Sequence, residues 1–335
     1  MTDRDLVLVT GATGLVGSHV AEQACKRGYH VRALVRRPSQ ASDLSRWGVE
    51  LVEGDITNRD SLTRATSAAT VIVHCAAKVG DWGPTSDYRI VNVDGLRHLL
   101  EAAESSATLR RFVHISSLGV YPARDHYGTD EFEPVSTTGI DGYTLTKVEA
   151  ENLVRDHIRD HRLPAVILRP GFIYGPRDRT ILPRLLARLK NGGFKFLGSG
   201  RQLLNNTYVG NLVEAIFLAI EKDSFVGEVF NITDDRLVSR REFIGAICQN
   251  AGLPTPTKAV PLPVAKLLAN LMEGVYRALG KQEAPLLSSA RIKFLGLNLD
   301  YSIDKARREL DYQPAIDFKE AMRITIAWCR ETGLV

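Results

Sequence analysis

The chain has 335 residues, of which 44% are hydrophobic and 24% are charged, and its formal net charge is +4 at pH 7. These values are ordinary for a soluble globular enzyme and leave room for one large α/β unit with a smaller second lobe. The charge is mild and no basic block occurs, which argues against a nucleic-acid-binding protein. No stretch of about 18 apolar residues occurs, so we expect no transmembrane helix.

The cysteines indicate a reducing environment. The chain has four of them, at Cys25, Cys75, Cys248 and Cys329. They form no C-x-x-C pair and their spacing fits no metal site, so we expect no bound metal and a cytoplasmic location. A strand follows directly after Asp5, without a basic stretch and an apolar stretch before it, so no signal peptide is expected.

The first 170 residues alternate short apolar runs with helical patterns. Strands are expected at residues 6–9, 31–35, 50–53, 70–74, 112–115 and 164–168, and helices at about 15–27 and 87–105. Strands that alternate with helices indicate βαβ units and a parallel sheet. Continuous apolar runs are typical of strands that are covered on both faces. We therefore predict the α/β class, with a Rossmann-type doubly wound parallel sheet.

Helices dominate after Arg169 and Pro170. They are expected at about 183–191, 209–222, 240–251, 264–279, 303–310 and 318–330. Ser239 and Glu242 form a capping box at the start of one of them. We predict a smaller, mainly helical C-terminal lobe that closes over the carboxyl edge of the sheet, where open α/β sheets bind ligands. The expected domains are a dinucleotide-binding domain over 1–170, with a return at about 203–235, and a substrate lobe over 171–202 and 236–335.

A glycine-rich turn, Thr10 to Gly17, follows the first strand and opens the first helix. Gly11 permits a tight turn, Gly14 lets the backbone approach a pyrophosphate, and Gly17 lets the helix pack closely on the strand. The helix N-terminus adds N–H groups and a positive dipole. The predicted contacts with a nicotinamide dinucleotide are Gly11, Thr13, Gly14, Leu15, Val16 and Gly17.

The residues after the second strand bear on the choice of cofactor. Arg36 and Arg37 stand where an NAD-preferring site usually has a carboxylate for the ribose 2′-hydroxyl. Guanidinium groups suit a 2′-phosphate, so we predict a preference for NADP(H), with NAD(H) as the alternative. Both arginines could also simply decorate a solvated loop.

Further cofactor contacts are expected at the ends of the third and fourth strands. Asp55, followed by Ile56, is predicted to accept a hydrogen bond from the adenine amino group; the alternative is a turn or helix-cap carboxylate. The small residues Ala76 and Ala77 leave room for the cofactor backbone.

Tyr143 and Lys147 are four residues apart, so they share one face of a helix. A phenol titrates near ~10, and a neighbouring ammonium lowers that pKa. Tyr143 is therefore predicted to act as general acid or base on a substrate oxygen, and Lys147 to donate to the nicotinamide ribose as well. Ser117 follows the fifth strand and is predicted to hydrogen-bond the same substrate oxygen; the alternative is a helix or turn cap.

Together these motifs span about half of the chain. In residue types and in order along the chain, the sequence resembles the extended short-chain dehydrogenase/reductases. The segments that carry the resemblance are Thr10 to Gly17, Gly54-Asp55, His74 to Ala77, Asn92, Ser116-Ser117, Val120-Tyr121, Tyr143 to Lys147, Arg169-Pro170-Gly171 and Tyr174-Gly175-Pro176. The resemblance implies Ser117, Tyr143 and Lys147 as catalytic residues and a structural Asn92. It also implies nicotinamide-end contacts from Pro170 to Ile173, and Lys78 completes the predicted cofactor set.

A narrower resemblance is to the 3β-hydroxysteroid dehydrogenase branch, with its sterol-4α-carboxylate dehydrogenases and bacterial 2-alkyl-3-oxoalkanoate reductases. It rests on residues 78–83, 207–212 and 301–306. It implies interconversion of a secondary alcohol and a ketone on a bulky apolar substrate of the steroid, sterol or 3-oxo acid type. The substrate would lie between residues 78–84, 118–121, 172–176 and the helical lobe. A homodimer through the helices near 87–105 and 142–160 is a family-level expectation.

Other functions stay open. A nucleotide-sugar epimerase with tightly bound NAD is the alternative, and Arg177, Arg179 and Arg201 would suit a sugar-nucleotide diphosphate. A dehydratase is disfavoured because Leu118 and Gly119, rather than an Asp-Glu pair, follow the serine. A non-catalytic dinucleotide sensor usually lacks the tyrosine or the lysine, and a flavonol-reductase-like enzyme would differ only in substrate.

One helical segment carries an apolar row. Its members are Val264, Leu267, Leu268, Leu271, Met272, Val275 and Leu279. The row predicts either an ordinary buried face or an apolar lid or membrane-surface helix that admits a lipid-like substrate. The second interpretation implies peripheral membrane contact.

Overall fold

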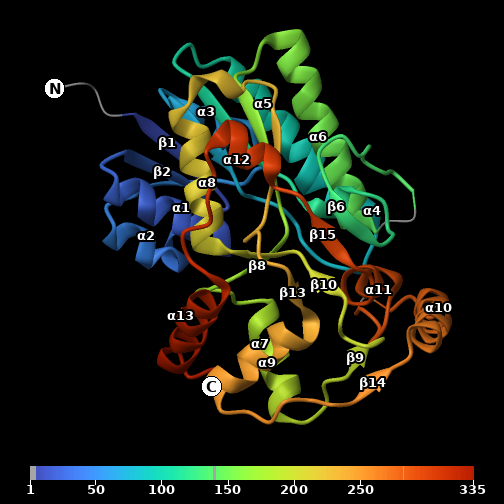
Figure 1. Ribbon diagram of the computed structural model, residues 1–335. Helices are drawn as coiled ribbons and strands as arrows, with labels where there is room; N and C mark the ends of the chain where they lie inside the picture. The colour runs from blue at the N-terminus through green and yellow to red at the C-terminus, as the bar shows by residue number, and fades with distance from the viewer. Residues whose placement is uncertain (1–4, 139–140, 282) are drawn as a thin grey trace.

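The computed structural model describes residues 5–138, 141–281 and 283–335. A seven-stranded sheet lies at its centre in the order β12-β7-β5-β4-β1-β2-β3, and every neighbouring pair is parallel (Figure 1). The strands are β1 (Leu6–Thr10), β2 (His30–Val35), β3 (Glu50–Glu53), β4 (Val71–His74), β5 (Arg111–Ile115), β7 (Ala165–Pro170) and β12 (Val229–Ile232). The strand order reverses between β1 and β4, which creates a ligand-binding crevice at their carboxyl ends. The predicted doubly wound sheet is confirmed.

Helices cover both faces of this sheet because its side chains are apolar on both sides. One layer consists of α1 (Leu15–Lys26), α2 (Ser42–Arg46), α8 (Val209–Glu221) and α12 (Asp304–Leu310). The other consists of α3 (Arg59–Thr66), α5 (Gly95–Glu104) and α6 (Gly142–His161). Along β1, Val7 and Val9 pack toward the first layer and Leu8 toward the second, as alternation along a strand requires.

The helix expected over residues 87–105 is a composite. It starts as α4 (Thr85–Arg89), continues through a π-helical turn (Ile90–Asp94) and ends as α5. Short 3-10 turns occur at Pro38–Gln40, Leu118–Val120 and Asp223–Phe225. Single π-helical turns inside helices are frequent at functional sites, and this one carries Asn92.

The remaining elements lie beyond the carboxyl ends of the strands (Figure 1). The helices are α7 (Ile181–Lys190), α9 (Arg240–Ala251), α10 (Leu262–Ala278), α11 (Ser289–Gly296) and α13 (Phe318–Glu331). Two-residue and three-residue strand pairs tie them together: β8 (Phe172–Tyr174) with β11 (Asn206–Tyr208), β9 (Phe196–Leu197) with β14 (Ala259–Val260), and β10 (Leu203–Leu204) with β13 (Val238–Ser239). A fourth pair joins β6 (His126–Thr129) to β15 (Leu299–Tyr301). Such short strands are too brief to show a period in the sequence.

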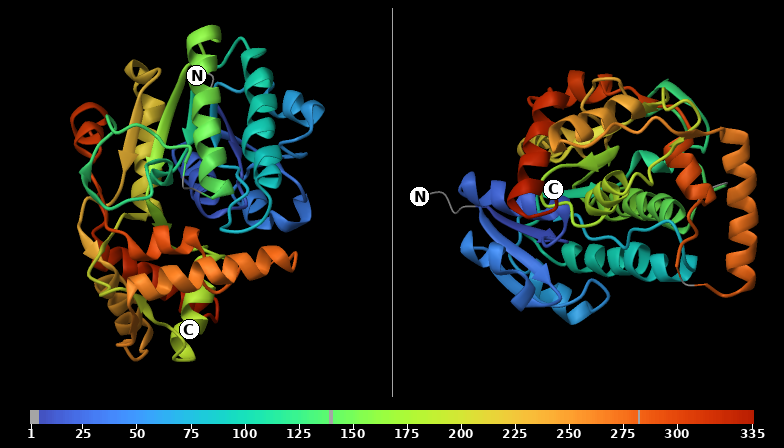
Figure 2. Two further views of the ribbon diagram at one scale, coloured as in Figure 1. Left: turned by 90° about the vertical axis from the view of Figure 1, so that its right-hand side faces the viewer. Right: turned by 90° about the horizontal axis from the view of Figure 1, so that it is seen from below.

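The apolar row of the sequence lies on α10 and is exposed. Its members Val264, Leu267, Leu268, Leu271, Val275 and Leu279 are 41% to 71% exposed, whereas the opposite side of the helix buries Ala265, Ala269 and Glu273. In Figure 2, α10 lies on the outside of the lobe, toward the viewer on the left and at the right margin on the right. The interpretation of this row as an ordinary buried face is therefore wrong.

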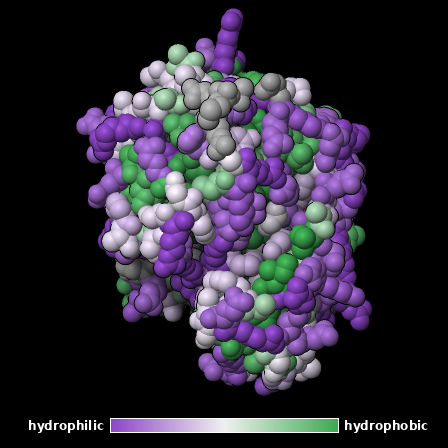
Figure 3. Space-filling model, turned by 90° about the vertical axis from the view of Figure 1, so that its left-hand side faces the viewer, coloured by the Kyte–Doolittle hydropathy of each residue, from purple (hydrophilic) through white to green (hydrophobic). Residues whose placement is uncertain are grey.

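The opposite side of the molecule has a different surface. It is largely hydrophilic, with hydrophobic residues in small separate patches (Figure 3). Within the described ranges, no helix combines the length and the apolar character needed to cross a bilayer.

Candidate active site

The turn between β1 and α1 is packed as a dinucleotide cradle requires. Gly11 has φ +69°, and a Cβ added there would lie 2.7 Å from the backbone nitrogen of Ala76. A Cβ on Gly17 would lie 2.3 Å from the Gly11 carbonyl oxygen. No described side chain caps α1 at Gly14, and its first turn has no acidic residue. The free N–H groups of this helix end therefore fit a pyrophosphate.

The residues after β2 and β3 differ in their surroundings. Arg36 and Arg37 are exposed, and over the described ranges neither guanidinium makes a hydrogen bond or an ion pair. The Asp55 carboxylate accepts hydrogen bonds from Thr57, from its backbone N–H at 2.9 Å and its hydroxyl at 2.7 Å. It thus acts as a turn cap, the alternative raised above, and its contact with adenine stays a prediction. The Ile56 side chain is buried in the core.

Ser117 and Tyr143 come together where β5 ends and α6 begins. Asp141 caps α6 by accepting a hydrogen bond from the Thr144 N–H at 2.9 Å. Burial raises the pKa of Tyr143 to about 12, the Asp141 carboxylate adds to the rise, and a hydrogen bond with the Ser117 side chain opposes it. The Ser117 hydroxyl also accepts from the Gly119 N–H at 3.0 Å. Ser117 therefore caps a 3-10 turn and at the same time contacts Tyr143.

Lys147 makes a contact with the neighbouring strand that the sequence did not predict. Its side chain is 5% exposed, and its Nζ donates to the Ile115 carbonyl oxygen at 2.7 Å. Burial lowers the pKa of Lys147 to about 8. The expectation that this ammonium lowers the pKa of Tyr143 is wrong, because the ammonium bonds to β5 and burial dominates the environment of the phenol.

A buried polar network lies beneath these residues. Arg169 and Glu151 form a bidentate ion pair, with Nη2–Oε2 at 2.6 Å and Nε–Oε1 at 2.8 Å, and both side chains are at most 2% exposed. The Ser116 hydroxyl donates to Glu151 at 2.5 Å, and Arg169 donates to the Tyr121 hydroxyl at 2.8 Å. The network joins β5, β7 and α6. Sequence reasoning missed Glu151, although it lies one helical turn after Lys147 on the same face.

Asn92 holds the chain at the edge of the predicted cofactor site. Its Oδ1 accepts from the Lys78 N–H at 2.7 Å, and its Nδ2 donates to the Lys78 carbonyl at 3.1 Å and to the Thr146 hydroxyl at 3.0 Å. These bonds support the structural role that the family resemblance implies for Asn92.

A pocket of about 870 Å³ opens beside the start of α6. Its walls are Asp81, Trp82, Gly83, Pro84, Thr85, Tyr88, Asp141, Gly142, Glu273, Tyr276, Arg277, Gly280, Lys281, Ser289, Ala290 and Lys293. The Trp82 indole donates to the Lys281 carbonyl at 3.0 Å and meets the Tyr276 ring edge-on. Part of the expected 78–84 wall is therefore present. The described lining does not include residues 172–176, because Phe172 and Tyr174 pack against Phe243 within the lobe.

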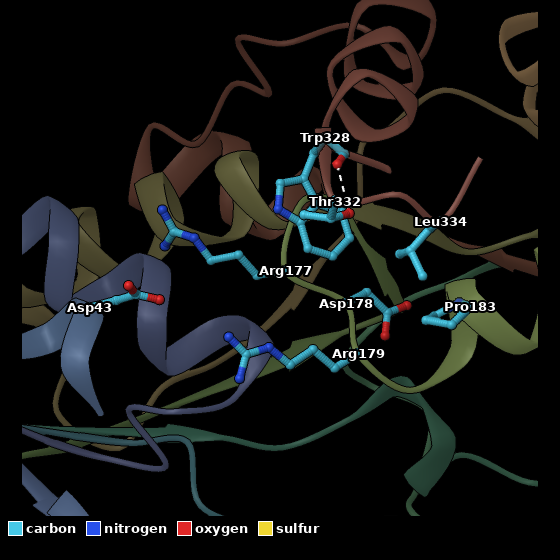
Figure 4. A pocket seen from close by; sticks show the side chains of 8 residues that line it. All are labelled: Asp43, Arg177, Asp178, Arg179, Pro183, Trp328, Thr332 and Leu334. Atoms are coloured by element: carbon cyan, nitrogen blue, oxygen red, sulfur yellow. Dashed lines mark hydrogen bonds between the residues drawn. The ribbon is translucent and has the colours of Figure 1, made fainter. Parts of the chain in front are cut away.

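A second pocket, of about 500 Å³, lies between α2 and α13 (Figure 4). Arg177 and Arg179 extend toward the side where Asp43 lies, and the Asp178 carboxylate turns the other way, toward Pro183. Arg177 forms an ion pair with Glu22 on α1. This contact gives Arg177 a structural task away from the pocket beside Tyr143, which weakens its value as a sign of sugar-nucleotide binding.

One group of candidate metal ligands was not predicted. Within the described part of the chain, the ligand atoms of Glu104, His157 and His161 lie within 4.8 Å of one another. The group sits at the far end of α6, about 15 Å along the helix axis from Lys147 at 1.5 Å per residue. It therefore has no contact with the predicted reacting groups.

Residues 7–233 of the chain match the family model described as the NAD dependent epimerase/dehydratase family. The chain belongs to this family. A ketoreductase from Stigmatella aurantiaca, named for 4-hydroxy-2-methyl-3-oxo-4-farnesyl-3,4-dihydroquinoline-1-oxide, is 31% identical over 316 residues, or 94% of this chain and 93% of the relative. The decarboxylating sterol-4-alpha-carboxylate 3-dehydrogenase of Candida albicans is 31% identical over 344 residues, or 97% of each.

Solved structures agree with this assignment. The crystal structure of gox2253 has a TM-score of 0.83 and 30% identity, and the match covers 99% of this chain and 100% of that one. The UDP-glucuronic acid 4-epimerase from Bacillus cereus in complex with NAD has a TM-score of 0.78, 23% identity and coverage of 98% and 99%, a likeness in fold alone. The predicted membership of the extended short-chain dehydrogenase/reductases is confirmed, and the chain is an NAD(P)-dependent oxidoreductase acting on CH–OH groups.

Proposed function

We propose that this protein interconverts a secondary alcohol and a ketone on a bulky apolar substrate of the 3β-hydroxysteroid, sterol or 3-oxo acid type. The observation that carries the proposal is the contact between the Ser117 and Tyr143 side chains at the carboxyl edge of the sheet. A pocket of about 870 Å³ with Trp82 and Tyr276 among its walls opens at the start of the same helix and supports a bulky substrate. The names of the ketoreductase and sterol dehydrogenase relatives support the same chemistry.

In the proposed mechanism, Tyr143 exchanges the proton with the substrate oxygen and Ser117 holds that oxygen by a hydrogen bond. A pKa of about 12 keeps the phenol protonated at neutral pH, so the residue is ready to donate to a carbonyl oxygen. Lys147 positions the end of β5 through the Ile115 carbonyl. A remaining N–H of the same ammonium would donate to the nicotinamide ribose of a bound cofactor. The bound nicotinamide cofactor supplies or accepts the hydride.

We propose NADP(H) as the preferred form of the cofactor. The support is the pair of unpartnered, exposed guanidinium groups of Arg36 and Arg37 after β2, within the described ranges. Charge-assisted hydrogen bonds from such groups suit a ribose 2′-phosphate. Gly11, Thr13, Gly14, Leu15, Val16, Gly17, Ala76, Ala77, Lys78, Pro170 and Ile173 complete the proposed contacts.

We also propose peripheral contact with an anionic membrane surface through α10. The exposed apolar row of this helix is accompanied by the cations Lys266, Arg277 and Lys281, which would face anionic lipid headgroups. Tyr276 and Arg277 of the same helix line the pocket, so a lipid-like substrate would enter beside the membrane. The two-domain division at residue 170, the homodimer and the cytoplasmic location remain predictions.

The function is tested with purified protein, both reduced cofactors and a panel of ketosteroids, sterol ketones and 3-oxo acids, in comparison with Tyr143→Phe. We expect turnover with exchangeable cofactor and a loss of about 100-fold to 10,000-fold in the variant. Cofactor that co-purifies as NAD and does not exchange, together with epimerisation of nucleotide sugars without net redox, would establish the epimerase alternative instead. An undiminished rate in Tyr143→Phe would remove the proposed role of the phenol.

A further inference from the structure

Lys293 of α11 brings a cation into the pocket beside the predicted reacting residues. Its Nζ donates to the Gly119 carbonyl oxygen at 2.7 Å and lies 3.4 Å from the Tyr121 carbonyl oxygen. An ammonium has three N–H donors, so one remains after these two contacts. Within the described ranges, no carboxylate lies within salt-bridge distance of this ammonium.

The acidic groups around the pocket are engaged with other partners. Asp81 forms an ion pair with Arg291. Glu273 accepts from the Ser289 N–H at 2.5 Å and from Arg277 at 3.0 Å. Asp141 accepts from the first turn of α6. The Asp141 carboxylate acts on Lys293 only from beyond salt-bridge distance. Lys293 therefore loses part of its hydration without a direct ion pair among the described residues, an arrangement that costs free energy unless a ligand supplies the opposite charge.

Gly119 links this cation to the predicted reacting hydroxyl groups. Its carbonyl oxygen accepts from Lys293, and its N–H donates to the Ser117 hydroxyl at 3.0 Å. The Ser117 side chain in turn contacts Tyr143. The ammonium and the hydroxyl pair thus contact the same short turn, Leu118–Val120 and its capping serine.

We propose that Lys293 binds the carboxylate of the substrate, and that the preferred substrates are β-hydroxy and β-oxo acids. In such an acid the carboxylate carbon is two bonds from the carbon that carries the reacting oxygen. An acid of this kind can place its carbonyl or hydroxyl oxygen at Ser117 and its carboxylate at the remaining N–H of Lys293. The inference rests on the proposed function and adds to it the charge of the preferred substrate and the residue that recognises that charge.

Stable alcohol substrates test this recognition. We would compare oxidation of a 2-alkyl-3-hydroxyalkanoic acid and of a 3β-hydroxysterol 4α-carboxylic acid with oxidation of their methyl esters, which keep the carbon skeleton and remove the charge. The variants are Lys293→Met, which removes the ammonium, and Lys293→Arg, which keeps a cation. Lys195→Met is the matched control, because this lysine is also exposed and lies outside the walls of the pocket.

We expect the unmodified protein to prefer the acids. Lys293→Met should raise KM for the acids by about 10-fold to 100-fold, the size of a lost charge-assisted hydrogen bond. It should leave KM for the esters within about twofold, since no charge pairs there. Lys293→Arg should recover part of the preference, and Lys195→Met should leave KM unchanged for both the acids and the esters.

Equal changes for acids and esters in Lys293→Met would overturn the inference and leave Lys293 as a tether between α11 and the Gly119 turn. Absence of a preference for acids in the unmodified protein would overturn it as well. In both cases turnover of the esters would still support the proposed function. Folded protein that oxidises neither acids nor esters with either cofactor would overturn both proposals, and a thermal melt establishes that each variant is folded.

Discussion

The Nζ atom of Lys147 lies 2.7 Å from the carbonyl oxygen of Ile115, so one buried ammonium joins α6 to the last residue of β5. Burial lowers the pKa of this lysine to about 8. A buried cation that bonds to a neutral carbonyl is costly for the folded state. We infer that the site keeps the lysine for its position beside the predicted cofactor and at the expense of stability.

Replacing this lysine should separate stability from activity. At pH 7 we expect the free energy of unfolding of Lys147→Met to exceed that of the unmodified protein by on the order of 1–3 kcal/mol. Its activity should fall at least about 100-fold. The lost hydrogen bond to Ile115 offsets part of the gain. Urea unfolding without cofactor measures the first effect, and steady-state turnover measures the second.

The same comparison has a defined pH dependence. The pKa of Lys147 is about 8 in the folded protein, below the value of about 10.4 in an unfolded chain. The unfolded state therefore binds more protons between these pH values, and this group raises the stability of the unmodified protein as pH increases from 8 to 10. The advantage of Lys147→Met should be full below pH 8 and shrink above it, whereas Lys281→Met, at an exposed position, should show no such trend. A difference that stays constant from pH 7 to 10 would contradict this explanation.

Cofactor preference should follow the charge after β2. Arg36→Asp should lower kcat/KM for NADPH relative to NADH by about 10-fold to 100-fold, because a carboxylate repels the 2′-phosphate and accepts from a free 2′-hydroxyl. Arg46→Asp, an equal charge change at another exposed position, serves as the control and should leave the ratio nearly unchanged. If the two variants behave alike, a general field effect rather than a direct contact governs the choice of cofactor.

We expect the exposed apolar row of α10 to contribute to the binding of lipid vesicles. The double variant Leu267→Asn/Leu271→Asn should bind vesicles rich in anionic phosphatidylglycerol about tenfold more weakly in a sedimentation assay, because two side chains lose their apolar burial. Leu237→Asn changes a side chain of similar exposure elsewhere and should have no effect. Equal vesicle binding by all three proteins would exclude this helix as the membrane contact.

We expect the stability losses caused by substitutions at Glu151 and Arg169 to be non-additive. Arg169→Met should destabilise the protein by about 3–5 kcal/mol, since it leaves a buried carboxylate without its partner. The double variant Glu151→Leu/Arg169→Met removes both charges and should recover a large part of that loss. Urea unfolding of the two single variants and the double variant completes the cycle. Additive losses would mean that the two side chains stabilise the fold independently.

Short-range patterns along the chain were sufficient for the sheet and the cofactor turn. The apolar runs predicted six of the seven central strands, because strands covered on both faces need continuous apolar sequence. Gly11, Gly14 and Gly17 were informative because their backbone lies directly between a strand and a helix. The N-cap of α9 was likewise local: the Ser239 hydroxyl accepts from the Glu242 N–H at 3.1 Å. The reciprocal contact of that capping box is replaced, since the Glu242 carboxylate pairs with Arg236.

The direction in which each side chain points, and the groups that it contacts, depended on contacts between distant segments of the chain. The i, i+4 spacing put Tyr143 and Lys147 on one face, but the packing of α6 on β5 aimed the lysine at Ile115. The period of α10 predicted an apolar row but not whether another element covers it. Lys293 meets the turn at Gly119 across 174 positions of sequence. Propensity and period act within a few residues, whereas charge, burial and pKa are set by whatever the folded chain packs against them.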